Sequence, residues 1–277
     1  KDGKPLGVYF KVQKEANQLI EEFMLLANRS VAEFVATGCK GVGDAPAKGA
    51  RKQVKTFVYR VHDEPNQEKL QNLRNFIGNF GYKMGPTTNG KEISKELNSL
   101  FVAAKDTPEY NAIELLSLRT MAKARYVIEN LGHYGLAFKY YTHFTSPIRR
   151  YPDLLVHRLL DRYLTLGARS VSQPKYEDLC EHCSAQEQVA ANAERASIKY
   201  KQVEFMSEHI GEEYDAVISG VTEWGLYAEI NDNKCEGMIP MRTLQDDYYE
   251  FDDANYCLIG RRTHRKFTIG DPVRIRI

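Results

Sequence analysis

The sequence predicts an α+β fold, because two different apolar periods follow one another along the chain. Apolar residues recur at helical spacing over residues 15–34 and over most of residues 94–209. From Gly211 onward they alternate with polar residues in short runs separated by turn residues, which is typical of strands. A largely helical part is therefore expected to precede a small β-barrel.

The front of the chain is expected to mix strands and helices. Alternating apolar residues over 6–12 follow turn residues and predict the second strand of a hairpin whose first strand is missing. The elements expected next are a helix over 15–34, a Gly-, Ala- and Lys-rich loop over 37–52, a strand over 56–61 and a helix ending near Gly81.

The helical region over 94–209 is expected to be broken at Pro108 and over residues 132–135, 145–147 and 167–174. Its last helix is predicted over 184–209. The apolar residues expected on one face of that helix are Val189, Ala193, Ala196, Tyr200 and Val203.

Strands are expected over 214–221, 225–230, 235–241 and 273–277. The chain ends inside the last of these, so both ends are expected to be cut from a longer protein. We expect two domains, residues 1–210 and residues 211–277.

Composition indicates a globular protein with one or two cores. The chain has 277 residues, of which 43% are hydrophobic and 27% charged, and no apolar run approaches the length of a membrane helix. Five scattered cysteines favour a reducing cytoplasm over a disulfide framework. The net charge of +1 divides into +6 before Gly211 and −5 from Gly211 on, which suits a polyanionic partner or an ordinary solvated surface.

Residues 140–158 carry the most informative motif. Ser146 as N-cap with Pro147 at the first helical position predicts a helix start, whose free N–H groups and dipole attract anions. Arg149 and Arg150 follow in the expected first turn, where two guanidinium groups suit a phosphate. The alternative is that these arginines pair with internal carboxylates such as Asp153.

These residues resemble a known family. Thr-Ser-Pro-Ile-Arg-Arg-Tyr over 145–151, with the Asp-Leu and His-Arg pairs that follow, is similar to the signature of the ribonuclease II and ribonuclease R exoribonucleases. The similarity continues through 21–28, 59–65, 132–138 and 193–206 and is nearest to the bacterial ribonuclease R branch. Residues 217–227 and 236–239 resemble the OB-fold RNA-binding domain of ribosomal S-one type.

The resemblance implies the second half of an exoribonuclease catalytic domain followed by an incomplete OB-fold barrel. It also implies processive 3′→5′ hydrolysis of single-stranded RNA to nucleoside 5′-monophosphates, with Mg²⁺ held by clustered aspartates. No match to that cluster occurs here, so no metal ligands are expected in this chain. The missing N-terminal half of the protein is the expected partner that supplies them, and the chain alone is expected to be inactive. The alternatives are a non-catalytic RNA-binding module of a silent family member and, less well supported by the arginines, a translation or RNA-chaperone factor.

The family motif assigns roles to individual residues of the first domain. Arg149 matches the arginine that contacts the scissile phosphate, and Glu194 matches a glutamate near the reacting end of the RNA. Arg150 is expected at a neighbouring phosphate. Glu194 could instead form a surface ion pair. Three further residues are expected to line the RNA, or else to pack or cap: Tyr141, His143 and Ser146.

Aromatic and thiol residues give weaker signals. Trp224 and Tyr227 are expected to stack on bases, although Trp224, the only tryptophan, could be a core residue. The Cys180–Cys183 spacing has no second pair at zinc-finger distance and is interpreted as chance. His62 could bind a metal but is interpreted as a structural hydrogen-bonding residue.

Overall fold

The computed structural model describes residues 3–10, 12–38, 55–86, 89–107, 109–165, 171–252 and 255–277. The chain forms two compact units, each assembled from separate stretches of sequence. The motif unit contains residues 11–64 and 122–194, and the sheet unit contains residues 1–10, 65–121 and 195–277. These units do not test the predicted domain boundary near residue 210, which stays a prediction.

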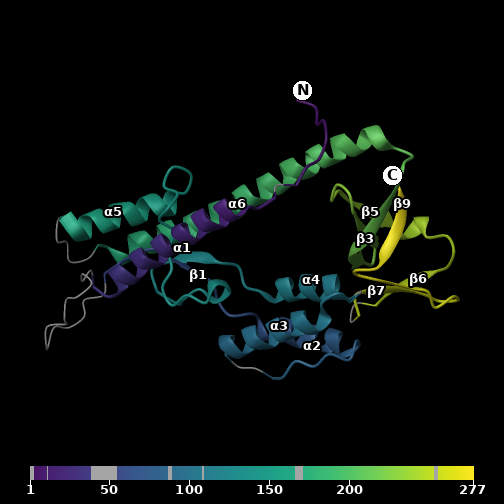
Figure 1. The fold of residues 1–277 in the computed structure, drawn as a ribbon, viewed down its shortest axis with the longest axis horizontal. Coiled ribbons are helices and arrows are strands. Elements are labelled where there is room, and N and C mark those ends of the chain that lie inside the picture. Colours follow the sequence, from purple (N-terminus) through teal and green to yellow (C-terminus); the bar gives the residue numbers. More distant parts are fainter. Residues whose placement is uncertain are drawn as a thin grey trace. The chain divides into compact units, whose positions relative to one another are not determined.

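The motif unit contains a two-stranded antiparallel sheet and three helices (Figure 1). Arg60 lies opposite Tyr126 in this sheet. Its elements are α1 (Glu15–Ala36), β1 (Tyr59–Val61), β2 (Arg125–Val127), the short 3-10 helix η1 (Tyr134–Leu136), α5 (Tyr151–Thr165) and the part of α6 (Gln173–Met206) up to residue 194.

One apolar cluster forms the core of the motif unit. It combines residues of α1, β1, β2, α5 and α6, among them Phe57, Val61 and Leu159. Cys180 and Cys183 belong to the same cluster, and both are free thiols. Both side chains pack in the core of this unit.

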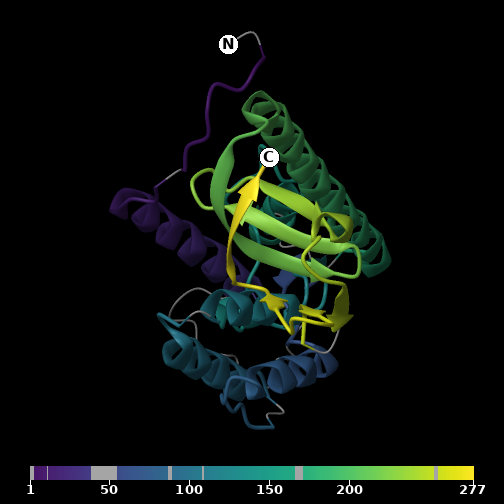
Figure 2. The same cartoon turned by 90° about the vertical axis from the view of Figure 1, so that its right-hand side faces the viewer.

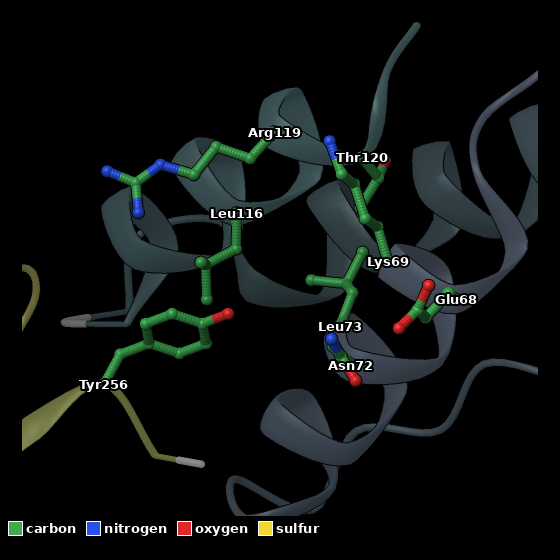
Figure 3. Close-up of a pocket in the computed structure, with 8 residues that line it drawn as sticks. All are labelled: Glu68, Lys69, Asn72, Leu73, Leu116, Arg119, Thr120 and Tyr256. Atoms are coloured by element: carbon green, nitrogen blue, oxygen red, sulfur yellow. The ribbon is translucent and has the colours of Figure 1, made fainter. Parts of the chain in front are cut away.

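The sheet unit combines helices with two open sheets (Figures 1 and 2). The helices are α2 (Gln67–Gly78), α3 (Gly90–Ala104), α4 (Tyr110–Thr120), the end of α6 and the 3-10 helices η2 (Ser207–His209) and η3 (Met241–Thr243). Leu73 of α2 and Leu116 of α4 are buried near one another (Figure 3). The strands are β3 (Glu213–Thr222), β4 (Gly225–Ile230), β5 (Glu236–Pro240), β6 (Tyr249–Asp252), β7 (Cys257–Gly260), β8 (Lys266–Thr268) and β9 (Pro272–Arg276).

The α+β prediction is confirmed. The four predicted strands correspond to β3, β4, β5 and β9, which form one antiparallel sheet in the order β5-β4-β3-β9. A second sheet, in the order β6-β7-β8, was not predicted. In the described ranges the two sheets do not close into a barrel, and the OB-fold stays a prediction.

Charged residues explain why this second sheet was not predicted from the sequence. Its first strand lies in the acidic stretch over 246–253, where charge hides the alternation of apolar residues. Arg265 pairs with Asp246 at 3.0 Å, and Arg261 pairs with Glu250. The basic and acidic segments therefore neutralise one another across this sheet, which makes these two arginines less available to RNA.

The turn between β3 and β4 depends on Gly225. Its φ of +148° lies in a region that side chains disfavour, and a Cβ at this position would collide with the Ile239 carbonyl oxygen. The close approach of the β3–β4 turn to β5 therefore requires glycine.

The strand predicted at the front of the chain is wrong. Residues 3–10 form no strand, because the described chain offers them no neighbouring strand to pair with. The apolar side chains in the first half of α1 are exposed, and Leu19, Ile20 and Phe23 are each more than half exposed. Burial begins at Asn28. The predicted loop over 37–52 lies mostly outside the described residues.

The later helical region also differs from its prediction. The last helix begins at Gln173, earlier than expected, with Pro174 in its first turn, where a missing N–H costs nothing. Val189, Tyr200 and Val203 of its predicted apolar face are exposed. No helix in the described ranges has the length and apolar character required to cross a membrane.

Candidate functional site

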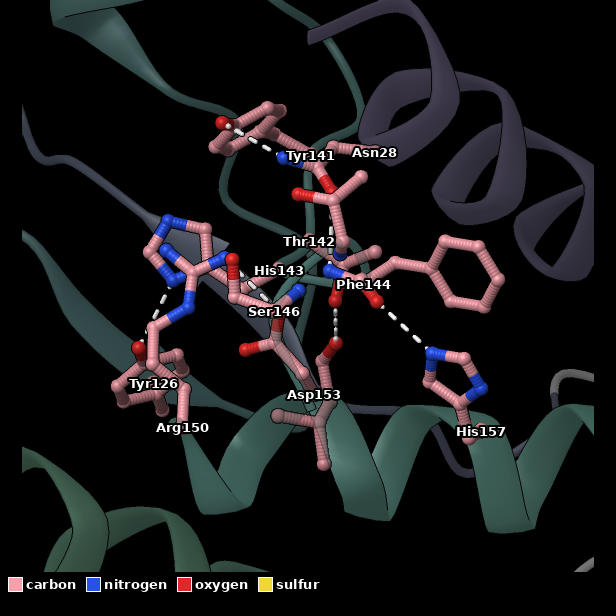
Figure 4. Close-up of polar contacts among 12 residues, drawn as sticks. Asn28, Tyr126, Tyr141, Thr142, His143, Phe144, Ser146, Arg150, Asp153 and His157 are labelled. Carbon is pink, nitrogen blue, oxygen red and sulfur yellow. Dashed lines mark hydrogen bonds and ion pairs between the residues drawn. The ribbon is translucent and has the colours of Figure 1, made fainter. Parts of the chain in front are cut away.

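The motif residues that precede α5, residues 140–150, form a loop that is called the motif loop below. Asn28 of α1 binds this loop (Figure 4). Its side chain is buried, and its Oδ1 accepts the backbone N–H groups of Phe144 at 2.9 Å and Thr145 at 3.2 Å. Its Nδ2 donates to the Tyr141 hydroxyl at 3.2 Å. A buried amide that satisfies three partners fixes the path of the loop.

The opposite side of the loop is tied to β1. The buried Thr142 hydroxyl donates to the Val58 carbonyl oxygen at 2.6 Å, and the Arg60 backbone N–H donates to the Tyr141 carbonyl oxygen at 3.0 Å. His157 of α5 donates from Nε2 to the Phe144 carbonyl oxygen at 2.8 Å. The loop is therefore held between α1, β1 and α5.

Tyr141 and His143, two of the predicted RNA-lining residues, lie together on this loop with ring centroids 5.8 Å apart. Tyr141 is buried and His143 is half-buried. His143 Nδ1 and the Tyr126 hydroxyl share a hydrogen bond of 2.8 Å. Both residues are therefore packed and hydrogen-bonded, as the packing alternative expects, and contact with RNA stays a prediction.

Burial favours the neutral forms of His143 and Tyr126. Burial, followed by the charges of Arg150 and Arg60, lowers the pKa of His143 to about 3. Burial raises the pKa of the Tyr126 hydroxyl. Positive charge near the loop is therefore carried by arginines and not by His143.

Arg60 is fixed by an ion pair beneath the loop. Its guanidinium binds the Glu187 carboxylate of α6 through both Nη atoms, at 2.6 Å and 3.1 Å, and lies over the Tyr126 ring at 4.6 Å. This bidentate arrangement orients the guanidinium and the Tyr126 ring together. Arg60 therefore supports the site from within and is not available to a ligand.

The turn that carries the arginines is organised by Asp153. Asp153 is fully buried, and its Oδ1 accepts both the Ser146 backbone N–H and Arg150 Nη2, each at 2.8 Å (Figure 4). Residues 147–149 form a turn, and α5 begins only at Tyr151. The predicted helix start at Ser146 is therefore wrong, because Asp153 caps the turn from inside the helix.

Arg149 and Arg150 separate into two roles. Arg150 is only 23% exposed and pairs with Asp153, as the internal-carboxylate alternative expects. Arg149 is exposed, and no carboxylate in the described ranges forms an ion pair with it. Arg149 therefore offers an uncommitted guanidinium to solvent at the tip of a fixed turn.

Glu194 lies on α6 beyond Glu187. Seven residues separate the two, so they start from the same face of one helix, about 10 Å apart along its axis. Glu194 is exposed, and no ion pair is recorded for it within the part of the chain that the structure describes. The alternative of a surface ion pair finds no support at this residue.

Trp224 and Tyr227 belong to the sheet unit. Trp224 is 70% exposed in the β3–β4 turn, which confirms the surface interpretation over the core alternative. Tyr227 on β4 is half-buried and its ring lies where a Cβ on Gly220 would contact it. Of the two, Trp224 is the more accessible stacking surface.

Several residues that organise the site were missed by the sequence analysis. Asn28 carried a signal, since it is a polar residue at helical spacing from the apolar Ala32 and Val35. Arg60, Tyr126 and Glu187 carried none, because their association depends on β2, a short strand that periodicity does not reveal.

The interpretation of His62 as a structural residue is confirmed. Its Nδ1 accepts the Gly135 backbone N–H at 2.9 Å, and its Nε2 donates to the Ala122 carbonyl oxygen at 2.7 Å. Both ring nitrogens are occupied, so neither is available to a metal.

The described residues do not fit a magnesium site. Within the described ranges, no three His, Cys, Asp or Glu side chains gather closely enough to hold a metal. Asp153, the buried carboxylate of the site, is bound by Ser146 and Arg150 through Oδ1. In the sheet unit, Asp246 is bound by Arg265, and Asp247 accepts the Thr263 backbone N–H at 2.6 Å.

Comparisons with known proteins identify relatives over the whole chain. The family described as the RNB domain matches residues 1–166. Ribonuclease R 1 of Lactococcus lactis is 38% identical over 281 residues, which cover 99% of this chain and 32% of that protein. The chain spans about a third of the length of the curated relatives that it matches.

Solved structures agree with this relationship. RNase R of Mycoplasma genitalium, in complex with ribose-methylated single-stranded RNA, has a TM-score of 0.82 and 30% identity, covering 99% of this chain and 41% of that chain. Yeast Ssd1, described as a pseudonuclease, has a TM-score of 0.67 and 26% identity, covering 89% of this chain and 29% of that chain. The family resemblance of the arginine motif is thereby confirmed. The chain belongs to the RNB-domain family, that of the ribonuclease R proteins.

Proposed function

We propose that this chain is part of an exoribonuclease that hydrolyses single-stranded RNA processively from its 3′ end and releases nucleoside 5′-monophosphates. One observation carries the proposal: Arg149 stands exposed and without an ion-pair partner in the described ranges, on a turn that buried Asp153 holds in place. The family relationship to ribonuclease R proteins supports the same reaction.

The proposed role of Arg149 is to bind the phosphate at the scissile bond. A planar guanidinium donates two parallel hydrogen bonds to phosphate oxygens, and charge on those oxygens changes as the bond breaks. Because Asp153 fixes the turn, the backbone that carries Arg149 is positioned before RNA binds. Arg149 is the residue of this chain that we expect to stabilise the transition state.

The neighbouring residues are assigned supporting roles. Arg150 holds the turn through Asp153 and retains partial exposure, so it can face an adjacent phosphate. Glu194 is placed near the reacting end of the RNA, where a carboxylate can accept hydrogen bonds from ribose hydroxyls. In the sheet unit, exposed Trp224 is proposed to stack on a base, and Tyr227 to assist it.

The metal requirement belongs to the proposal as well. We place the Mg²⁺ ligands outside residues 1–277, in the N-terminal half of the longer protein, since the described residues do not fit such a site. Mg²⁺ would stabilise the charge on the reacting oxygens. A cytoplasmic location is likewise proposed, on the free thiols.

The test replaces Arg149 in a longer protein that contains this chain and its N-terminal half. Arg149→Ala should lower turnover about a hundredfold or more while weakening RNA binding much less, because the interaction lost acts mainly in the transition state. Arg149→Lys should rescue poorly, since an ammonium lacks the bidentate geometry. Arg162→Ala is the matched control, because Arg162 is an exposed arginine of α5 outside the turn.

A loss of affinity with unchanged turnover would contradict the assignment of Arg149. A second candidate, a non-catalytic RNA-binding module, is favoured by the likeness to a yeast pseudonuclease. It predicts that even the longer protein releases no nucleoside monophosphates with Mg²⁺ present. Residues 1–277 alone should bind RNA with a clear salt dependence and release none under either proposal.

A further inference from the structure

The sheet unit contains a pocket of about 520 Å³ that the proposed function does not use (Figure 3). Buried Leu73 and Leu116 form its apolar side, and half-buried Tyr256 stands beside them. The remaining lining residues are polar or charged: Glu68, Lys69, Asn72, Arg119 and Thr120. Its volume lies within the range of small-ligand sites, and its lining combines apolar surface with a few polar groups, as such sites do.

Two cations stand at this pocket. Lys69 lies in the first turn of α2 and Arg119 in the last turn of α4, and both are exposed. Neither forms an ion pair with a carboxylate in the described ranges, although Glu68 lines the same pocket. A cation in the first turn of a helix is disfavoured by the helix dipole, so Lys69 gains nothing from its own helix. An anion bound at either side chain would compensate its charge.

Tyr256 supplies an aromatic surface beside these cations. Its backbone φ is +49°, a left-handed conformation that is uncommon for a bulky residue. Its ring packs edge-on against Phe76, with centroids 6.2 Å apart. Figure 3 shows the ring directed toward Leu116. A half-buried ring held in this way offers a face to a flat apolar group.

We propose that this pocket binds a nucleoside phosphate. The base packs on Tyr256, and the phosphate is bound by Arg119, whose guanidinium lies on the same side of the pocket as the Tyr256 ring (Figure 3). Glu68 and Asn72 then face the ribose and the base edge, where a carboxylate accepts from hydroxyls and an amide both donates and accepts. A flat apolar surface beside two uncommitted cations matches a nucleotide better than a purely apolar ligand or a simple anion.

Two sources share this chemistry: a free nucleoside monophosphate and one nucleotide of an RNA strand. The proposal goes beyond the proposed function, because no residue of the pocket belongs to the site around Arg149. An RNA nucleotide held here would be a second attachment point for the strand. A free monophosphate would instead make the pocket a site for the class of product that the proposed reaction releases.

The experiment uses calorimetry to measure how tightly the full chain binds two ligands: adenosine 5′-monophosphate and a short single-stranded oligoribonucleotide. Arg119→Gln should weaken binding of the ligand that occupies the pocket about tenfold, since a charge-assisted hydrogen bond is lost. Lys105→Gln, an exposed lysine outside the pocket, should change nothing. Tyr256→Phe should retain binding and Tyr256→Leu should weaken it, because the stacking face is what matters.

A photo-crosslink from a 4-thiouridine nucleotide should map to the segment that contains Tyr256. If adenosine 5′-monophosphate binds and Arg119→Gln weakens that binding, the pocket binds a free monophosphate. If only the oligoribonucleotide shows this effect, the pocket binds one nucleotide of an RNA strand. If Arg119→Gln and Lys105→Gln bind both ligands as the unchanged chain does, the proposal is overturned. An Arg149→Ala chain separates the two proposals, because it should still crosslink at Tyr256. Melting temperatures of all variants exclude unfolding as the cause.

Discussion

Asp153 and Arg150 form an ion pair of 2.8 Å in which the carboxylate is fully buried and the guanidinium is only 23% exposed. The Ser146 backbone N–H binds the same carboxylate oxygen. The other carboxylate oxygen and Arg150 Nε are buried and find no hydrogen-bond partner among the described residues. The turn that presents Arg149 therefore depends on one oxygen atom.

Asp153→Ala should destabilise the chain by about 3–5 kcal/mol, because it leaves a largely buried guanidinium and a backbone N–H without a partner. Urea unfolding of the purified chain measures this loss. Asp161→Ala, at an exposed carboxylate of the same helix, should cost about 0.5 kcal/mol or less. If both variants lose the same unfolding free energy, the buried ion pair contributes no more to stability than an exposed carboxylate does.

The stability of the motif unit should fall on acidification through His143. Its pKa is lowered from 6.5 to about 3, so between these values the unfolded chain binds a proton that the folded chain does not. Stability from this residue is therefore present above pH 6.5 and lost as the pH falls toward 3.

His143→Gln keeps a hydrogen-bonding partner for Tyr126 but cannot titrate. It should reduce the slope of unfolding free energy against pH, over pH 6.5 to 4, by up to about 1.4 kcal/mol per pH unit. Urea unfolding at several pH values measures the slope. Identical slopes for the variant and the unchanged chain would show that His143 is protonated without cost.

Trp224→Ala should weaken binding to a short single-stranded RNA by about 1–3 kcal/mol without lowering the melting temperature, because the side chain is 70% exposed. Trp224→Phe should keep most of the affinity. Fluorescence anisotropy with labelled RNA measures both variants. If Trp224→Ala also lowers the melting temperature, the indole contributes to the stability of the fold.

Gly225→Ala should cost about 3 kcal/mol or more, because a Cβ there meets the backbone of β5 and φ is +148°. Gly237→Ala, on the neighbouring β5, is the matched control, since a Cβ there contacts nothing within 4 Å. Thermal unfolding compares the two. Similar melting temperatures would show that the turn can relax around a methyl group.

Sequence periodicity predicted the elements whose partners are local. The helices α1 and α2 and the strands β3, β4, β5 and β9 all follow from it, because apolar spacing and turn residues act within short stretches. The strands β6, β7 and β8 were missed, and in β6 the charged residues around the apolar ones hide the alternation.

The candidate site was predictable in its residue types but not in its bonding. Arg149 and Arg150 are adjacent in sequence and look alike, yet only Arg150 has a buried carboxylate within reach. The contact of Asn28 with Phe144 joins residues more than 100 positions apart. Sequence spacing does not show which distant residues come into contact. The structure was therefore needed to distinguish Arg150, which supports the turn, from Arg149, which is exposed to solvent.

Because the described cysteines are buried, thiol labelling can measure how often each unit of the chain unfolds. Cys180 and Cys183 lie in the core of the motif unit, and Cys235 and Cys257 are buried in the sheet unit. Burial raises the pKa of each of these thiols, to about 12 for Cys180. Thiolates are the species that alkylating reagents attack, so labelling must wait for exposure. With Cys39 replaced by serine, the rate at which each unit gains a label would follow how often that unit opens.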